Sequence, residues 1–264
     1  MLLASRDLKQ RRDDQAAGLR RILAQATPAT MIELIAPGGV GTLVSRLALA
    51  AAQAGRDVLV LDATPGEAAT ALGLASRYEL SHVMSGERAL TRVLLEGPAG
   101  IRVLPAMRGV RTLKPAHLSE LAARLPQAAD LVIVATRTSV LPVGIDAEPL
   151  LAVTPAAAAI TAAYGEAKRI AARRRRLLTV IDRAGSEDEA RRVHANLADA
   201  AERFLGLTVE YAGAVSDDDR RGHSRAASCV AFDSDPAANP ADAYARLVAR
   251  FDRLRTADAP TAAH

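Results

Sequence analysis

The chain has 264 residues, of which 50% are hydrophobic and 24% are charged, which is the composition of a globular protein with one large core or at most two small domains. Its net charge is only +4, nearly all of its cations are arginine and tryptophan is absent, so we expect a solvated surface and no direct nucleic-acid binding through base-stacking platforms. The lone cysteine excludes an internal disulfide, and no apolar run approaches the roughly 20 residues that span a bilayer, so we expect a cytoplasmic protein.

Residues 1–29 form a charged segment ahead of the first apolar run. Within this segment Ala16, Leu19 and Leu23 recur at helical spacing and give one apolar stripe. A helix this short is marginal on its own, and Gly18 weakens it further. We therefore expect a flexible N-terminal helix and linker, which either packs loosely on the core or folds on a partner.

Short runs of apolar and β-branched residues recur along the rest of the chain and predict strands that are buried on both faces. These runs are Met31–Ile35, Asp57–Leu61, Ile101–Leu104, Leu131–Val134, Leu150–Val153, Leu177–Ile181 and Thr208–Tyr211. Helical patterns lie between many of them, at Leu43–Ala54, Ala116–Leu125, Ala156–Ala172 and Glu187–Phe204. This alternation predicts a single α/β domain over residues 30–255, with a mostly parallel sheet flanked by helices, and we expect residues 256–264 to form a disordered tail.

A glycine-rich turn, "APGGVGTL", follows the first predicted strand and precedes the first helix, which is the layout of a phosphate-binding loop. Gly38, Gly39 and Gly41 keep the backbone part of such a loop, since successive N–H groups at a helix N-terminus can wrap phosphates. Thr42 stands where these loops carry lysine, and Leu43 stands where they carry the hydroxyl that binds Mg²⁺. The sequence shows no nearby lysine that could replace the missing charge. The turn is therefore interpreted either as a vestigial nucleotide site or as tight packing alone.

The last helical pattern, "PADAYARLVARFDRLR", has an apolar face that includes Leu247 and Phe251, with arginines elsewhere on the helix. A basic amphipathic helix of this kind either covers the sheet or lies on an anionic membrane, which it would contact through Leu247 and Phe251. The histidines and Cys229 show no metal-ligand spacing, so no metal site is predicted.

The order of these segments resembles the MinD/ParA-type P-loop ATPases, and among them the FlhG/FleN regulators of flagellar number. The resemblance begins with "IAPGGVGTLVSRLALAAAQAGRDVLVLDATPGEAATALGL" and continues through "VMSGERALTRVLLEGPAGIRVLPAMRGV". It resumes in "TPAAAAITAAYGEAKRIAARR" and in "NLADAAERFLGLTVEYAGAVSDD", so it covers nearly the whole chain. It implies a MinD-like P-loop NTPase fold, in a family whose activity is ATP hydrolysis.

The chain departs from the family at the residues that carry this chemistry. The two loop lysines of the family correspond to Pro37 and Thr42, and its Mg²⁺-binding hydroxyl corresponds to Leu43. An acidic residue at the end of a core strand corresponds to Ala135, and Asp62 alone is kept among the acidic positions. The resemblance thus implies no catalytic residue, no ATP hydrolysis and no resident cofactor, with bound ATP or ADP and Mg²⁺ as the alternative. The vestigial nucleotide site consists of Gly38, Gly39, Gly41, Thr42 and Asp62.

The N-terminal segment carries a second match to the family. FlhG-type proteins have a D-Q-A-x-x-L-R motif that binds FlhF, a GTPase of the signal-recognition-particle type, and stimulates its GTP hydrolysis. The matching residues, which we expect to bind the partner, are Asp14, Gln15, Ala16, Leu19 and Arg20. Because a glutamine amide can orient the attacking water in a GTPase, the resemblance implies that Gln15 reaches toward the active site of the partner.

The resemblance implies a regulator of flagellar number or placement that acts by protein–protein binding. We expect a monomer that binds an FlhF-like GTPase through its N-terminal segment, and flagellar switch or transcriptional regulator proteins through its core. The alternative is a residual MinD-like ATPase that dimerises on ATP and associates with the membrane. For the protein itself we expect a cytoplasmic location, or a peripheral one at the inner membrane or the cell pole.

Overall fold

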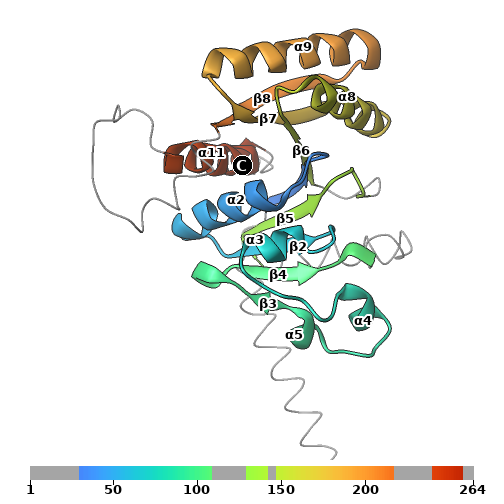
Figure 1. Cartoon of the computed structure of the whole chain (residues 1–264), viewed down its shortest axis with the longest axis vertical. Helices are drawn as coiled ribbons and strands as arrows, with labels where there is room; N and C mark the ends of the chain where they lie inside the picture. The colour runs from blue at the N-terminus through green and yellow to red at the C-terminus, as the bar shows by residue number, and fades with distance from the viewer. Residues whose placement is uncertain (1–29, 109–128, 142–146, 217–239, 258–264) are drawn as a thin grey trace, which may run out of the picture.

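The computed structural model describes residues 30–108, 129–141, 147–216 and 240–257. Within these residues an eight-stranded sheet forms the centre, in the order β3-β4-β2-β5-β1-β6-β7-β8 (Figure 1). The strands are β1 (Thr30–Ile35), β2 (Val58–Asp62), β3 (Leu95–Glu96), β4 (Arg102–Pro105), β5 (Leu131–Thr136), β6 (Glu148–Val153), β7 (Arg176–Ala184) and β8 (Thr208–Ser216). Neighbouring strands pair in parallel, except that the short β3 pairs with β4 in the antiparallel sense.

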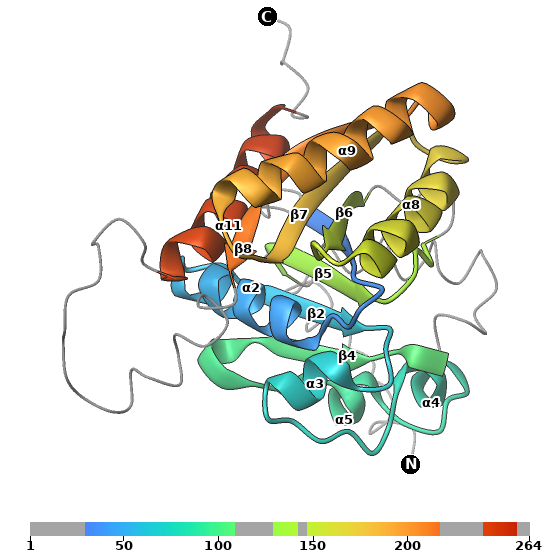
Figure 2. The same ribbon diagram turned by 45° about the horizontal axis from the view of Figure 1, so that its top comes forward.

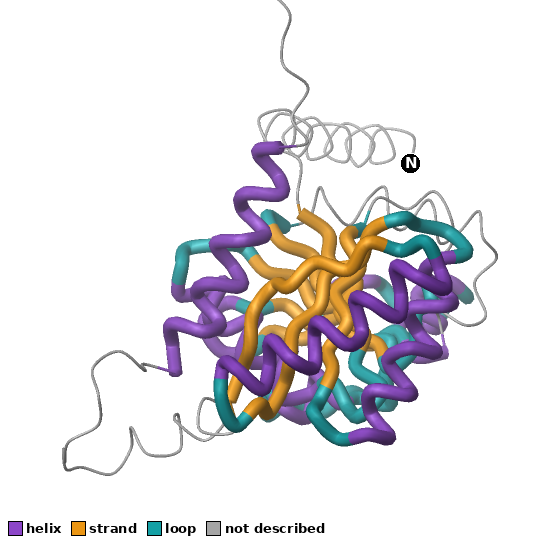
Figure 3. The backbone as a smooth tube through the Cα atoms, turned by 90° about the horizontal axis from the view of Figure 1, so that it is seen from above, coloured by secondary structure: helices purple, strands orange, loops and turns teal. Residues whose placement is uncertain are grey.

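Helices cover both faces of this sheet, so that it lies enclosed between them (Figure 3). The described helices are α2 (Gly41–Gln53), α3 (Glu67–Ala71), α4 (Leu80–Met84), α5 (Leu90–Val93), α8 (Ala157–Ala171), α9 (Glu187–Leu205) and α11 (Pro240–Ala257), with a 3₁₀ turn, η1, at Pro98–Gly100. The first face packs against α2, α3 and α11, and the second packs against α4, α5, α8 and α9. Figure 2 shows α8 and α9 beside β6 and β7.

Strand β1 shows how the two faces divide the core. Ile32 and Leu34 point into the cluster that contains α2 and α11, while Met31 and Ile35 point to the opposite face. Because successive side chains of a strand alternate between faces, a strand buried on both faces must be apolar throughout. The exception is Glu33, whose buried carboxylate lies on the second face between two apolar clusters.

The predicted α/β fold is confirmed. The seven predicted strands correspond to β1, β2 and β4–β8, and three of the predicted helices correspond to α2, α8 and α9. Sequence reasoning missed β3 and the short helices α3, α4 and α5, which are too brief to show a helical period. The predicted helix Ala116–Leu125, residues 1–29 and Cys229 lie outside the described residues.

Helix α11 packs on the first face of the sheet. Of the two interpretations of its sequence pattern, the structure therefore agrees with the one in which this helix covers the sheet. It packs against α2, β8 and β1, and its apolar side chains join the core cluster of that face. Leu247 and Phe251 are each only 1% exposed, so in this structure they do not form the exposed apolar face that membrane contact requires. None of the described helices is both long and apolar enough to cross a bilayer.

A half-buried histidine on α9 gives the fold a testable pH dependence. Nδ1 of His194 lies 2.8 Å from the hydroxyl of Thr179, and its ring packs against Tyr211. Burial lowers the pKa of His194 below its ordinary value of 6.5, since the charged ring would lose water.

We therefore expect stability that is fully present above about pH 6.5 and that falls as the pH drops below it, because the unfolded chain then binds the proton more readily. Urea denaturation at several pH values measures this loss. His194→Gln should flatten the dependence in that window, and an unchanged slope in the variant would contradict the assignment to His194.

Candidate functional site

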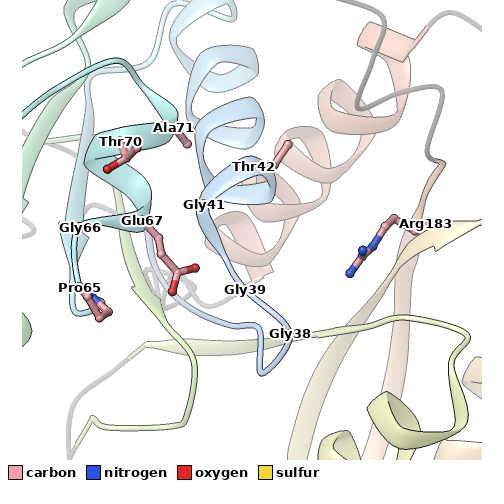
Figure 4. Close-up of a pocket in the computed structure, with 10 residues that line it drawn as sticks. All are labelled: Gly38, Gly39, Gly41, Thr42, Pro65, Gly66, Glu67, Thr70, Ala71 and Arg183. Atoms are coloured by element: carbon pink, nitrogen blue, oxygen red, sulfur yellow. The ribbon is translucent and has the colours of Figure 1, made fainter.

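The glycine loop lies at the edge of the sheet where the parallel strands end. It joins the end of β1 to the start of α2, and β1 pairs with β5 on one side and β6 on the other. Ligands of open α/β sheets bind in the crevice outside this edge. A pocket of about 460 Å³ opens there (Figure 4). Its lining residues are Gly38, Gly39, Gly41, Thr42, Pro65, Gly66, Glu67, Thr70, Ala71 and Arg183.

Four of the five predicted nucleotide-site residues line this pocket, and the glycines among them differ in what they do. Gly39 has φ +114°, a conformation that L side chains rarely adopt. A Cβ on Gly41 would lie 2.7 Å from the backbone oxygen of Glu67, so only glycine allows α3 to approach the loop this closely. A Cβ on Gly38 would meet only the guanidinium of Arg183, at 3.9 Å. Thr42 is exposed in the first turn of α2.

The fifth predicted residue, Asp62, is buried behind the pocket and organises the turn that follows β2. Its Oδ1 accepts hydrogen bonds from the backbone N–H and the hydroxyl of Thr64, at 3.1 and 2.5 Å. Its Oδ2 accepts from the N–H of Ala69 at 3.0 Å. The Thr64 hydroxyl in turn accepts from the N–H of Glu67 at 2.9 Å. Asp62 therefore positions the start of α3 relative to the glycine loop.

Glu67, which sequence reasoning did not identify, points its carboxylate at the loop (Figure 4). Its Oε2 accepts a hydrogen bond from the backbone N–H of Val40 at 2.9 Å. Its Oε1 accepts from Nε of Arg137 at 2.5 Å, and Arg137 directly follows β5. The carboxylate thus connects the glycine loop with the segment after β5, across two strand ends.

Two arginines bring positive charge to the loop, although the sequence shows no nearby lysine. Arg137 is one of them, through Glu67. Arg183 is the other, and it extends toward Gly38 from the end of β7 (Figure 4). Arg183 has φ +63°, and its Nε lies 3.7 Å from a carboxylate oxygen of Asp182. Both residues are remote in sequence from the loop, so a search for a local substitute could not find them.

The residues present do not fit a magnesium nucleotide held as P-loop enzymes hold it. Leu43 is a buried core residue and Ala135 is buried in β5, and neither side chain carries an oxygen that could ligate Mg²⁺. Among the described residues, no group of three or more His, Cys, Asp or Glu could hold a metal ion. Glu67 also places a carboxylate on the Val40 N–H of the loop, and a phosphate brought to the same N–H would meet a like charge.

The predicted partner-binding residues lie outside the part of the chain that the structure describes. They are Asp14, Gln15, Ala16, Leu19 and Arg20.

Comparison with curated sequences finds a relative that is matched over more than two thirds of both chains. The antiactivator FleN of Pseudomonas aeruginosa is 35% identical over 201 residues, which cover 69% of this chain and 71% of FleN. An uncharacterised ATP-binding protein of Methanocaldococcus jannaschii is 32% identical over 127 residues, which cover 45% of this chain and 46% of that protein. No family model matches the chain.

Solved structures show the same fold at low sequence identity. The MinD cell division protein of Aquifex aeolicus has a TM-score of 0.59 and 17% identity, and the match covers 85% of this chain and 97% of MinD. Apo McdA of Cyanothece has a TM-score of 0.56 and 11% identity, over 83% of this chain and 99% of McdA. The eight-stranded, mostly parallel sheet and its flanking helices are therefore those of a MinD-like P-loop NTPase.

The two outer glycines of the loop provide a matched pair for testing the contact with α3. We expect Gly41→Ala to lower the free energy of unfolding by about 1–3 kcal/mol, because a methyl group there forces α3 away from the loop. We expect Gly38→Ala to change it by less than about 0.5 kcal/mol, since its Cβ meets only a flexible side chain. Urea denaturation of both variants measures the difference, and equal losses would contradict the tight contact.

Proposed function

This chain belongs to the MinD/ParA family of P-loop proteins, in the branch of FleN, and on that premise we propose that it regulates flagellar number or placement by binding other proteins. The observation that carries the proposal is the 35% identity to antiactivator FleN over 201 residues. The likeness to MinD supports the fold on which this regulator is built, at an identity too low to carry more.

We propose further that the protein does not hydrolyse ATP. Phosphoryl transfer depends on positioning and on neutralising charge, and a single well-placed cation is worth roughly 10³–10⁵ in rate. Thr42 supplies no charge, and the apolar side chains of Leu43 and Ala135 cannot ligate Mg²⁺ or orient water. The loss of these groups together supports a protein that acts by contact and not by nucleotide turnover.

The proposed partner of the N-terminal segment is an FlhF-like GTPase. The support is the match of residues 14–20 to the D-Q-A-x-x-L-R motif, together with the ability of a glutamine amide to orient an attacking water. In this proposal the α/β domain binds flagellar switch or transcriptional regulator proteins, and the N-terminal segment acts on the GTPase.

Nucleotide binding separates this proposal from the alternative of a residual ATPase that dimerises on ATP. We expect no heat of binding at micromolar Mg·ATP, no phosphate release, and the same elution volume in size-exclusion chromatography with and without ATP. Thr42→Ala should change none of these. Micromolar affinity with turnover that Thr42→Ala abolishes, or a dimer formed on ATP, would support the residual ATPase instead.

The N-terminal segment is tested by its effect on the partner. We expect deletion of residues 1–24 to remove the FlhF-like GTPase from a pull-down. We expect Gln15→Ala to lower stimulation of its GTP hydrolysis by at least about tenfold, because the water-orienting amide is lost. Gln25→Ala serves as the matched control, since it removes the same amide outside the motif. Unchanged stimulation by Gln15→Ala would contradict the role assigned to this glutamine.

A further inference from the structure

The glycine loop already holds an anion, and that anion belongs to this chain. Backbone N–H groups at the start of a helix bind anions, because they have no partner within the helix and carry partial positive charge. The Val40 N–H, directly before α2, donates to Oε2 of Glu67 at 2.9 Å. A Cβ built on Gly39 would lie 3.5 Å from the same oxygen. The carboxylate therefore rests on the Gly39–Val40 part of the loop.

Several independent contacts fix Glu67 in this position. The N–H of Glu67 donates to the Thr64 hydroxyl, which Asp62 holds. Gly66 has φ +85° and turns the backbone into α3 immediately before Glu67. The backbone oxygen of Glu67 fits against Gly41 only because that residue has no side chain. The side chain is thus aimed at the loop by the fold of the backbone on both sides.

The second carboxylate oxygen extends the contact to the segment that follows β5. Oε1 of Glu67 accepts from Arg137, and the next residue, Thr138, donates its hydroxyl to Glu166 of α8 at 3.1 Å. The N–H of Ser139 donates to the same oxygen of Glu166, also at 3.1 Å. The segment is therefore held between α3 on one side and α8 on the other.

Glu33, the buried carboxylate of β1, also holds the segment that follows β5. Glu33 accepts hydrogen bonds from the hydroxyl of Ser139 at 2.9 Å and from the N–H groups of Val140 and Leu141 at 2.7 and 3.1 Å. Arg173, just after α8, donates to the hydroxyl of Ser139 and to the backbone oxygen of Leu141.

We propose that Glu67 is a built-in anion for the glycine loop, and that with Arg137 it holds the loop, α3 and the segment after β5 in one arrangement that needs no nucleotide. The carboxylate uses the loop amide that a phosphate oxygen would use, and it pairs with Arg137. This inference concerns how the loop is occupied and does not depend on the flagellar role.

Removing the carboxylate should open the loop to another anion. We would titrate the full chain with inorganic pyrophosphate, without metal, and follow the heat of binding. Glu67→Ala should bind at least about tenfold more tightly than the wild type, because it frees the Val40 N–H and removes a repelling charge. Glu67→Gln should gain less, because its amide oxygen can still accept from Val40. Glu96→Ala, which changes the same charge at an exposed position on β3, should match the wild type.

Hydrogen exchange tests the same contact without any added ligand. The Val40 N–H should exchange slowly in the absence of nucleotide, and it should exchange faster in Glu67→Gln and in Arg137→Gln. Rapid exchange of Val40 in the wild type would overturn the proposal, as would equal pyrophosphate affinity of the wild type and Glu67→Ala. Turnover of Mg·ATP by a wild type whose Val40 N–H exchanges slowly without nucleotide would contradict only the proposed lack of hydrolysis, so the two failures are distinguishable.

Discussion

The close approach of α3 to the glycine loop is the constraint on which the whole site depends. The backbone oxygen of Glu67 lies 2.7 Å from the place where a Cβ of residue 41 would be, so the contact exists only because residue 41 is glycine. Once α3 starts at this distance, the side chain of Glu67 reaches the Val40 N–H directly. The packing of α3 therefore requires glycine in the loop, whether or not the loop binds a phosphate as such loops do in enzymes.

Carboxylates that an enzyme could use for chemistry serve here to hold backbone. Asp62 accepts from the N–H of Thr64 and of Ala69, Glu33 from two N–H groups after β5, and Glu166 from one. A buried charge is costly unless it is hydrogen-bonded, and each of these is satisfied by groups at the edge where the strands end. At this edge of the sheet, hydrogen bonds from these carboxylates hold the connecting segments in place.

Much of the fold could be predicted because buried parallel strands leave a strong signal. Runs such as Leu131–Val134 are apolar on both faces, and their alternation with helical patterns predicts one mostly parallel sheet. The four- and five-residue helices after β2 left no such signal, since a single turn shows no repeat. The sequence does carry one signal of this site in Glu33. A carboxylate within an apolar run predicts that buried hydrogen-bond donors lie nearby.

The contact of Glu67 with the glycine loop and Arg137 could not be predicted, because it depends on the order of the strands in the sheet and not on their order in the sequence. Glu67 and Arg137 meet because β5 lies between β1 and β2, although they are far apart along the chain. Arg183 reaches the loop from β7 for the same kind of reason. The positive charge near the loop therefore comes from arginines that follow or end distant strands, and not from a lysine close to the loop in sequence.

The packing of α11 on α2 has a consequence for how the protein is made. Helix α2 forms from residues near the start of the described chain, whereas its cover comes from residues 243–251 near the end. During synthesis the side of α2 that packs on α11 stays uncovered until the strands β2 to β8 have left the ribosome, because α11 follows all of them in the chain. A nascent chain that stalls before α11 thus presents an unfinished core, which is the kind of surface that chaperones bind and that aggregates when they do not.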